Sequence, residues 1–271
     1  MKYHIIGINK SSLQTFNFLK KKYLNVSISD KKNYSDIKKK INEIKISKNF
    51  FFGYHPKKKI EAANYIIYAS GVIKDDLEYK DFLNNKKKIS EIDIFYKYKN
   101  WPVNNILLIT GSKGKTTIAK IVLNQLIRKK LFRKVIFMDR KKINFANIPY
   151  YKKGFFLIIE MDYQSLLISK KIAAKFRVIT SYYKSENKVL SNEDLYKNAK
   201  LKIFQNIKKN QIIFINKKTY MKLKPKINIF KKNMNINYSN NSIINNNNLL
   251  SKNIINKILE NFHGKNQKFI K

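Results

Sequence analysis

The residue types best suited to chemistry gather in one short segment, Gly111-Ser112-Lys113-Gly114-Lys115-Thr116-Thr117. Its two glycines allow backbone N–H groups to approach phosphate oxygens. In loops of this type the lysine, here Lys115, neutralises the β- and γ-phosphates, and the hydroxyl after it, here Thr116, binds Mg²⁺. Ile109 stands where a complete Walker pattern has its first glycine, so the loop is a variant. Because an apolar run precedes the segment and a helical pattern follows it, we expect nucleotide binding rather than a structural turn.

A second candidate for metal chemistry is Glu160, which ends the apolar run at residues 155–159. A carboxylate at the carboxyl end of a parallel strand, next to a phosphate loop, can hold Mg²⁺. The alternative is an ordinary surface carboxylate, and the spacing alone leaves both open. The histidines do not have the spacing of metal ligands, which gives no support to a zinc site or a catalytic histidine; they are His4, His55 and His263.

The phosphate loop needs a strand before it and a helix after it, and the sequence supplies both from Trp101 onward. The run NNILLIT leads into the loop, and IAKIVLNQLIRKK after it has helical periodicity. The other elements predicted in this unit are strands at residues 134–138, 155–160, 176–180 and 211–216, and helices at residues 192–205 and 254–262. The asparagine-rich stretch at residues 240–250 is predicted to be a loop rather than a site.

An earlier unit of Rossmann type is indicated at the start of the chain. Its predicted elements are strands ending at Gly7 and at residues 25–29, 64–69 and 92–96, and a helix at residues 12–22. Asp30 follows the second strand, where a Rossmann fold places an acidic residue. Of the G-x-G-x-x-G fingerprint only Gly7 is present, with Asn9 and Ser12 at the other positions, so tight dinucleotide binding is not expected. The alternation of strands and helices predicts an α/β fold with two parallel sheets.

The composition is dominated by lysine. The 271 residues suit about two domains, and 58 Lys and Arg against 17 Asp and Glu give a formal net charge of +41. Such a charge ordinarily indicates a nucleic-acid partner. Arginine, however, occurs only at Arg128, Arg133, Arg140 and Arg177, and the lysines are spread along the chain among many Asn and Ile residues, which share A/T-rich codons. Biased codon usage explains the charge more economically than a binding surface, so we expect only non-specific binding of nucleic acid.

The remaining composition favours a folded protein of the cytoplasm. Hydrophobic residues make up 44% of the chain, enough to bury a core. The absence of cysteine excludes disulfides, thiolate zinc sites and a cysteine nucleophile, and makes a reducing compartment the default. The first ten residues do not form a signal-type apolar core, and no run approaches the ~20 apolar residues of a membrane span, so no membrane insertion is expected.

These motifs resemble the Mur ligase family, and within it the member that adds D-glutamate. The segments similar to the family's first domain are Gly7-Ile8-Asn9-Lys10-Ser11-Ser12 (G-x-G-K-S-G), Ser29-Asp30 (S-D), Ala69-Ser70-Gly71-Val72 (S-P-G-I) and Ser90-Glu91-Ile92-Asp93-Ile94-Phe95 (G-E-I-E-L-F). Those similar to its second domain are GSKGKTT, Asn147-Ile148 (N-I-G), Glu160-Met161-Asp162-Tyr163-Gln164 (E-L-S-S-F-Q) and Tyr196-Lys197-Asn198-Ala199-Lys200 (Y-x-x-A-K). The resemblance therefore covers nearly the whole chain.

The resemblance implies a Rossmann-like domain at residues 1–96 that binds the UDP part of UDP-N-acetylmuramoyl-L-alanine, and an ATP- and Mg²⁺-binding central domain at residues 97–255. D-Glutamate would be the second substrate, joined through an acyl phosphate in peptidoglycan precursor synthesis. Lys115 and Lys200 would be catalytic, with Lys200 carbamylated. The metal ligands implied are Thr116, Glu160, Glu186 and Lys200, and the substrate-binding residues are Asn9, Lys10, Ser11, Asp30, Ser70, Gly71 and Asn147.

Two departures from the family pattern leave alternatives open. Glu186 stands where the family has a metal-binding histidine, and a carboxylate can still bind Mg²⁺. The family's third domain is not recognisable, so residues 256–271 are expected to be a remnant of its start; the chain is either a reduced ligase that works alone or one that a separate partner chain completes. The alternatives are a nucleotide-binding remnant without ligase activity and, less favoured, a basic nucleic-acid-binding NTPase.

Overall fold

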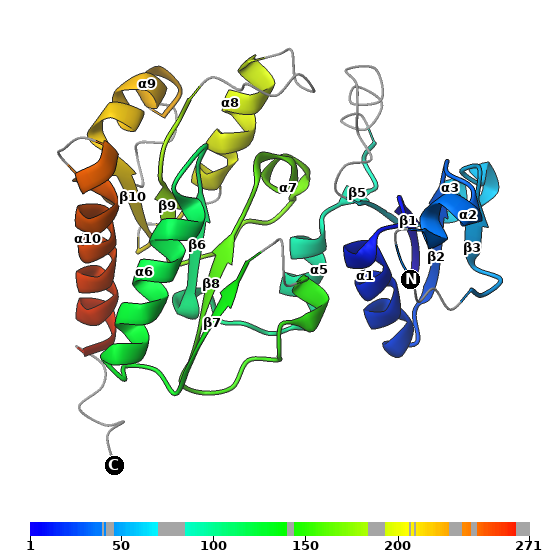
Figure 1. The fold of residues 1–271 in the computed structure, drawn as a ribbon, viewed down its shortest axis with the longest axis horizontal. Coiled ribbons are helices and arrows are strands. Elements are labelled where there is room, and N and C mark those ends of the chain that lie inside the picture. The colour runs from blue at the N-terminus through cyan, green and yellow to red at the C-terminus, as the bar shows by residue number, and fades with distance from the viewer. Residues whose placement is uncertain are drawn as a thin grey trace.

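The computed structural model of the chain contains two parallel β-sheets, each with helices packed against it (Figure 1). It describes residues 1–39, 41, 46–69, 85–139, 144–183, 193–205, 207–208, 210–227, 235–239 and 243–263. The first sheet has the strand order β3-β2-β1-β4-β5, and the second has the order β11-β10-β9-β6-β8-β7. The predicted α/β class with two parallel sheets is confirmed.

The first sheet is built around β1 (Lys2–Ile6), which lies between β2 (Asn25–Asp30) and β4 (Tyr65–Tyr68). The outer strands are β3 (Phe50–Phe52) and β5 (Lys88–Ile89), and the helices are α1 (Lys10–Lys21), α2 (Tyr34–Lys38) and α3 (Lys57–Ala62). Helix α1 begins at a capping box, in which the side chains of Asn9 and Ser12 each accept a hydrogen bond from the other residue's backbone N–H. Its buried Phe16 and Leu19 pack with Ile5 and Ile28 of the sheet in one core cluster.

The second sheet is built around β6 (Ile106–Thr110), which lies between β9 (Phe176–Ile179) and β8 (Phe155–Glu160). The other strands are β7 (Lys134–Met138), β10 (Ile212–Asn216) and β11 (Asn235–Ser239). All five residues of β6 are buried, as expected of a central parallel strand with both faces covered. This burial holds the end of β6, where the phosphate loop begins, in a fixed position.

Helices cover both faces of the second sheet. Helices α6 (Lys115–Arg128) and α10 (Ile243–His263) lie against each other on one face, and α7 (Tyr163–Ile168), α8 (Glu193–Leu201) and the 3-10 turn η3 (Lys202–Phe204) share the core of the other (Figure 1). The remaining elements are α5 (Glu91–Tyr98), α9 (Lys217–Ile227) and the 3-10 turns η1 (Val103–Asn105) and η2 (Phe145–Asn147). The core is therefore two layers of apolar side chains, one on each side of the sheet.

Two sequence predictions are wrong. Residues 92–96 form part of α5 and not a strand, because Ser90 and Asp93 make a capping box that starts a helix there. The asparagine-rich stretch lies largely inside α10 and not in a loop, since the apolar residues that follow, among them Ile254 and Ile258, are buried in the core of the second sheet. In both places tertiary packing and capping outweigh local composition.

The predicted domain limits are not tested by these elements. The boundary at 96/97 falls within α5 and that at 255/256 within α10, which runs unbroken from Ile243 to His263. Both divisions stay predictions. Among the described residues, no helix combines the length and the apolar character needed to cross a membrane.

Candidate functional site

The predicted phosphate loop lies between the carboxyl end of β6 and the start of α6. Gly111 has φ +149° and Gly114 has φ +84°, a left-handed conformation that favours glycine. A Cβ atom on Gly111 would lie 1.9 Å from Oγ1 of Thr180, so no side chain fits there. Strand, tight glycine turn and helix N-terminus thus follow one another as the motif predicts.

The segment after β9 braces this loop. The backbone N–H of Ser112 donates to the Ser181 carbonyl at 3.0 Å, and the backbone N–H of Lys113 donates to the Ser181 hydroxyl at 2.8 Å. Ser112 Oγ accepts from the N–H of Tyr183 at 3.1 Å and lies 2.8 Å from the hydroxyl of Tyr196. Because these two loop N–H groups are engaged, the first turn of α6, whose N–H groups have no partner within the helix, is the part that can meet phosphate.

Lys115, Thr116 and Glu160 meet at the start of α6. The Lys115 ammonium donates to the carbonyl oxygen of Gly111 at 3.0 Å, folded back over the loop. The Thr116 hydroxyl donates to Glu160 Oε2 at 2.8 Å. Glu160 is the last residue of β8, the neighbour of β6, and the two strand ends bring its carboxylate beside the loop. A hydroxyl and a carboxylate side by side are oxygen ligands of the kind that Mg²⁺ prefers, with water and phosphate oxygens completing its shell.

Lys200 is buried beside the same loop, with 2% of its surface exposed. Its ammonium donates to the Gly111 carbonyl at 2.9 Å and to Thr110 Oγ1 at 3.3 Å. The pKa of Lys200 is lowered to about 7, chiefly by burial and also by the nearby charge of Lys115, while Asp162 and Glu160 act in the opposite direction. Lys200 therefore has a substantial neutral fraction at pH 7, unlike an exposed lysine.

The structure brings together most of the site residues that were predicted in the second sheet's unit. Lys113 and Thr117 are exposed at the same loop. The predicted ligand Glu186 lies outside the described residues. No group of three or more His, Asp or Glu side chains that could hold a metal ion occurs in the described part of the chain. The fit to Mg²⁺ therefore rests on the Thr116 and Glu160 pair beside a phosphate loop.

Four predicted substrate residues lie at the carboxyl edge of the first sheet. Asn9 caps α1, Lys10 is exposed in its first turn, and Ser11 donates to Glu91 at 3.1 Å. The Asp30 carboxylate accepts from the backbone N–H of Ile8 at 2.7 Å, which ties the turn after β1 to the end of β2. In open parallel sheets ligands bind outside this edge, so these positions suit a ligand site.

The other predicted substrate residues belong to the second sheet's unit or lie outside the described residues. Asn147 ends η2 in the second sheet's unit and is exposed. Ser70 and Gly71 lie outside the described residues.

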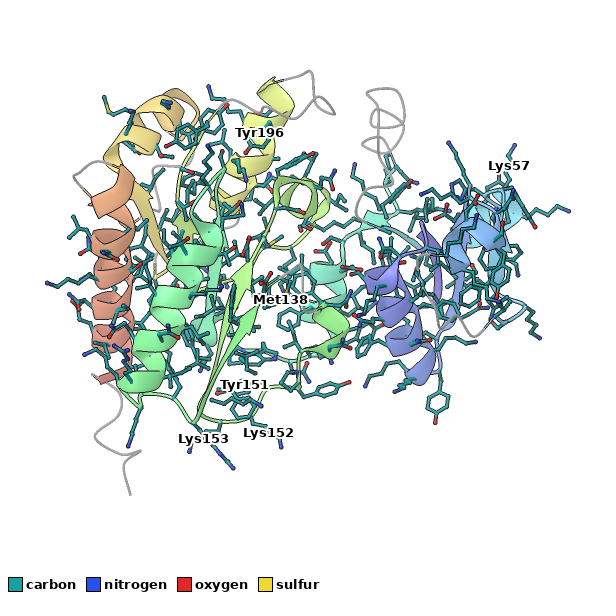
Figure 2. All side chains as sticks on the ribbon, in the orientation of Figure 1. Lys57, Met138, Tyr151, Lys152, Lys153 and Tyr196 are labelled. Atoms are coloured by element: carbon teal, nitrogen blue, oxygen red, sulfur yellow. The ribbon has the colours of Figure 1, made fainter. Side chains whose placement is uncertain are left out.

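Sequence reasoning placed Tyr196 in a family-like motif but assigned no role to its side chain, which supports the loop. Tyr196 lies on α8 one helical turn before Lys200 (Figure 2), and its ring is 5.2 Å from the Lys200 ammonium. Burial raises the pKa of Tyr196, which keeps its hydroxyl neutral for the contact with Ser112. The four-residue spacing of Tyr196 and Lys200 on a helix is a signal that could have indicated a shared face.

Comparisons with known proteins find relatives in sequence and in fold. No family model matches the chain. A UDP-N-acetylmuramoylalanine--D-glutamate ligase of Caldicellulosiruptor saccharolyticus is 27% identical over 210 residues, which cover 75% of this chain and 45% of that protein. The protein of the same name from Staphylococcus epidermidis is 23% identical over 218 residues, which cover 78% and 46%. The chain thus spans about half the length of the curated relatives it matches.

The fold has a counterpart among solved structures. The UDP-N-acetylmuramate:L-alanyl-gamma-D-glutamyl-meso-diaminopimelate ligase from Neisseria meningitides superimposes with a TM-score of 0.50 at 15% identity, covering 88% of this chain and 77% of that one. In fold, then, this chain resembles the Mur ligases, and in sequence it resembles the D-glutamate-adding members of that family.

Proposed function

We propose that this chain is the substrate- and ATP-binding part of a ligase that adds D-glutamate to UDP-N-acetylmuramoyl-L-alanine in peptidoglycan precursor synthesis. The observation that carries the proposal is the convergence of Lys115, Thr116, Glu160 and Lys200 on one glycine loop. The similarity to D-glutamate-adding ligases supplies the substrates. The reaction transfers the γ-phosphoryl group of ATP to the alanyl carboxylate, and the amine of D-glutamate then displaces phosphate from the acyl phosphate.

The loop residues would act mainly by neutralising charge. The Lys115 ammonium, which now donates to the Gly111 carbonyl, would turn to the β- and γ-phosphates when ATP occupies the loop. The first turn of α6 adds backbone donors and the positive end of the helix dipole. Together these groups stabilise the charge on the phosphoryl group as it is transferred.

Thr116 and Glu160 are the residues that would hold Mg²⁺, which would supply further positive charge at the phosphates. Lys200 would serve a second metal position. Because its pKa is about 7, its amine is partly neutral, and a neutral amine is the form that adds CO₂ with loss of a proton to give a carbamate. Glu186 would be a further ligand of that metal, as the family pattern implies.

The first sheet would bind the UDP part of the substrate. Asn9, Lys10, Ser11 and Asp30 lie at its carboxyl edge, and Ser70, Gly71 and Asn147 would complete the contacts. Lys10 is the exposed cation of this group and would meet a phosphate at the N-terminus of α1. The polar groups of Asn9 and Asp30 hold the turns in place and leave backbone groups at the edge for the ligand.

The test is product formation from ATP, Mg²⁺, UDP-N-acetylmuramoyl-L-alanine and D-glutamate, compared with the Lys115→Ala variant. We expect ADP and the ligated product from the unchanged chain, and a loss of at least about a hundredfold in the variant because a phosphate-neutralising charge is removed. The matched control is Lys129→Ala, an exposed lysine at the opposite end of the same helix, and it should leave the rate unchanged.

Binding measurements separate the ways in which the proposal can fail. ATP binding that depends on Lys115, without product from folded protein, would leave a nucleotide-binding protein and contradict ligase activity for this chain. ATP hydrolysis that responds to nucleic acid and ignores the UDP compound would favour the basic NTPase instead.

A further inference from the structure

The two sheets are joined at a buried polar contact between α1 and the segment at η2. Asn144, with 6% of its surface exposed, lies at the centre of this contact. Its amide oxygen accepts from the backbone N–H of Ala146 at 2.6 Å and so caps η2. Its amide nitrogen donates to the backbone carbonyl of Ser11 in α1 at 2.9 Å and also contacts the Ser11 hydroxyl. One amide group is thus bonded to both sheets' units at once.

Glu91, at the start of α5, completes the contact. Its carboxylate accepts from the hydroxyls of Ser11 at 3.1 Å and Thr15 at 3.0 Å, and lies 3.3 Å from the amide nitrogen of Asn144. An ionised carboxylate can only accept hydrogen bonds, so the oxygens of Glu91 need donors around them. The amide nitrogen of Asn144 is one of these donors. We call Ser11, Glu91 and Asn144 the junction.

A second contact holds the same turn. The Lys99 ammonium, with 4% of the residue exposed, donates to the carbonyl of Ala146 at 2.9 Å. It lies between the ring of Phe18 in α1, at 4.6 Å, and the ring of Tyr150, at 4.7 Å. The N–H of Ala146 is bonded by Asn144 and its carbonyl by Lys99, so the backbone just before Asn147 is held from both sides.

We infer that Asn144 is a positioning residue that fixes Ser11 of the first sheet's unit and Asn147 of the second in one arrangement, although it need not touch a ligand. What binds there rests on the proposed function, in which both residues contact the UDP substrate. The arrangement itself rests only on the junction. A chain with a loosened junction keeps both Ser11 and Asn147 but no longer holds them in a fixed arrangement. The relative position of two groups that bind one ligand strongly affects both affinity and rate.

The test starts from Asn144→Asp. Aspartate keeps the oxygen that caps η2 but loses both amide donors and places a second carboxylate beside Glu91, so the contact between the units should open. The control is Asn104→Asp, which adds the same charge at an exposed position of η1. Because the chain has no cysteine, Lys20→Cys in α1 and Lys120→Cys in α6 give two unique positions for spin labels on exposed residues of the two units.

The distance distribution between the labels is the first readout, and it requires no ligand. We expect it to broaden in Asn144→Asp and to stay unchanged in Asn104→Asp. Adding Glu91→Gln to Asn144→Asp should narrow it again, since the glutamine amide can donate to the new carboxylate and its oxygen can still accept from Thr15. Circular dichroism confirms that each variant is folded. An unchanged distribution in folded Asn144→Asp would overturn the inference.

Calorimetric titration with UDP-N-acetylmuramoyl-L-alanine and, separately, with an ATP analogue is the second readout. We expect Asn144→Asp to weaken binding of the UDP compound about tenfold or more, with binding of the ATP analogue unchanged and with recovery in the Glu91→Gln double variant. A broadened distribution with unchanged binding of the UDP compound would overturn the positioning role. If the unchanged chain does not bind the UDP compound at all, the proposed function fails, while the label distances still decide whether Asn144 fixes the arrangement.

Discussion

At the scale of single residues, the buried Lys200 is the group whose chemistry differs most from that of the many exposed lysines. It donates to a carbonyl and a hydroxyl rather than to a carboxylate, so its charge is only partly compensated. Unfolding returns Lys200 to water, where its pKa is the ordinary 10.5.

This difference predicts a pH dependence of stability. Between a pKa of about 7 in the folded chain and 10.5 in the unfolded chain, unfolding takes up one proton at Lys200, so its contribution to stability rises with pH. The slope approaches about 1.4 kcal/mol per pH unit. Lys200→Met removes this slope, and the variant should gain stability relative to the unchanged chain as the pH falls towards 7. Urea denaturation of both chains at several pH values measures it.

Other titrating groups are common to both chains and cancel in the difference. Stability curves of the two chains that run parallel over this pH range would show that Lys200 keeps its ordinary pKa in the folded state.

At the scale of elements, Gly111 allows the end of β6 to pack closely against Thr180, the residue that follows β9. We predict that Gly111→Ala weakens binding of an ATP analogue at least about tenfold and destabilises the fold, because the added methyl group collides with Thr180 and φ +149° is strained for alanine. Gly154→Ala is the matched control. Gly154 also has a positive φ, +83°, but lies in the turn before β8 next to Arg133, so the fold should weaken while nucleotide binding by the folded fraction persists.

Fluorescence titration with a labelled ATP analogue, together with thermal unfolding, separates the two effects. Equal nucleotide affinity in folded Gly111→Ala would contradict the close packing of the loop against Thr180.

The sequence predicts elements well where local and tertiary signals agree. The apolar run before Gly111 and the helical period after Lys115 belong to a buried strand and a helix that pack on each other, and both were predicted. Residues 92–96 are rich in β-branched and aromatic residues, as a strand is, but the capping pair Ser90 and Asp93 decides for a helix. The short β3 (Phe50–Phe52) was missed because three residues carry too little periodicity.

The candidate site is likewise predictable only where its residues belong to local sequence motifs. Lys115, Thr116 and Glu160 follow from strand ends and a loop motif, which are local in sequence. The brace made by Ser181, together with the burial of Lys200, depends on side chains that meet only when β9 and α8 are packed, and no local pattern encodes that packing.

At the scale of the whole molecule, the net charge of +41 governs contacts with any polyanion. Exposed lysines extend from both units, such as Lys57 on α3 and Lys152 and Lys153 before β8, the last two at the end of the second unit opposite Tyr196 (Figure 2). Charges spread in this way attract nucleic acid without reading its sequence.

We therefore predict that binding to mixed-sequence duplex DNA falls about a thousandfold between about 50 and 200 mM salt, whereas binding of an ATP analogue changes much less. Fluorescence anisotropy with DNA of two unrelated sequences measures the slope and the preference. A shallow salt dependence together with a marked preference for one sequence would favour the nucleic-acid-binding alternative.

The placement of β6 also determines when the second unit can form during synthesis. β6 is made before both of its partners, β8 (Phe155–Glu160) and β9 (Phe176–Ile179), and parallel pairing across such separations closes slowly. Until those strands leave the ribosome, both hydrogen-bonding edges of β6 are open, whereas the first sheet is complete once Ile89 has emerged. The nascent chain therefore carries a finished first unit and an unpaired apolar strand together, and repulsion between its many lysines opposes pairing of neighbouring nascent chains through that strand.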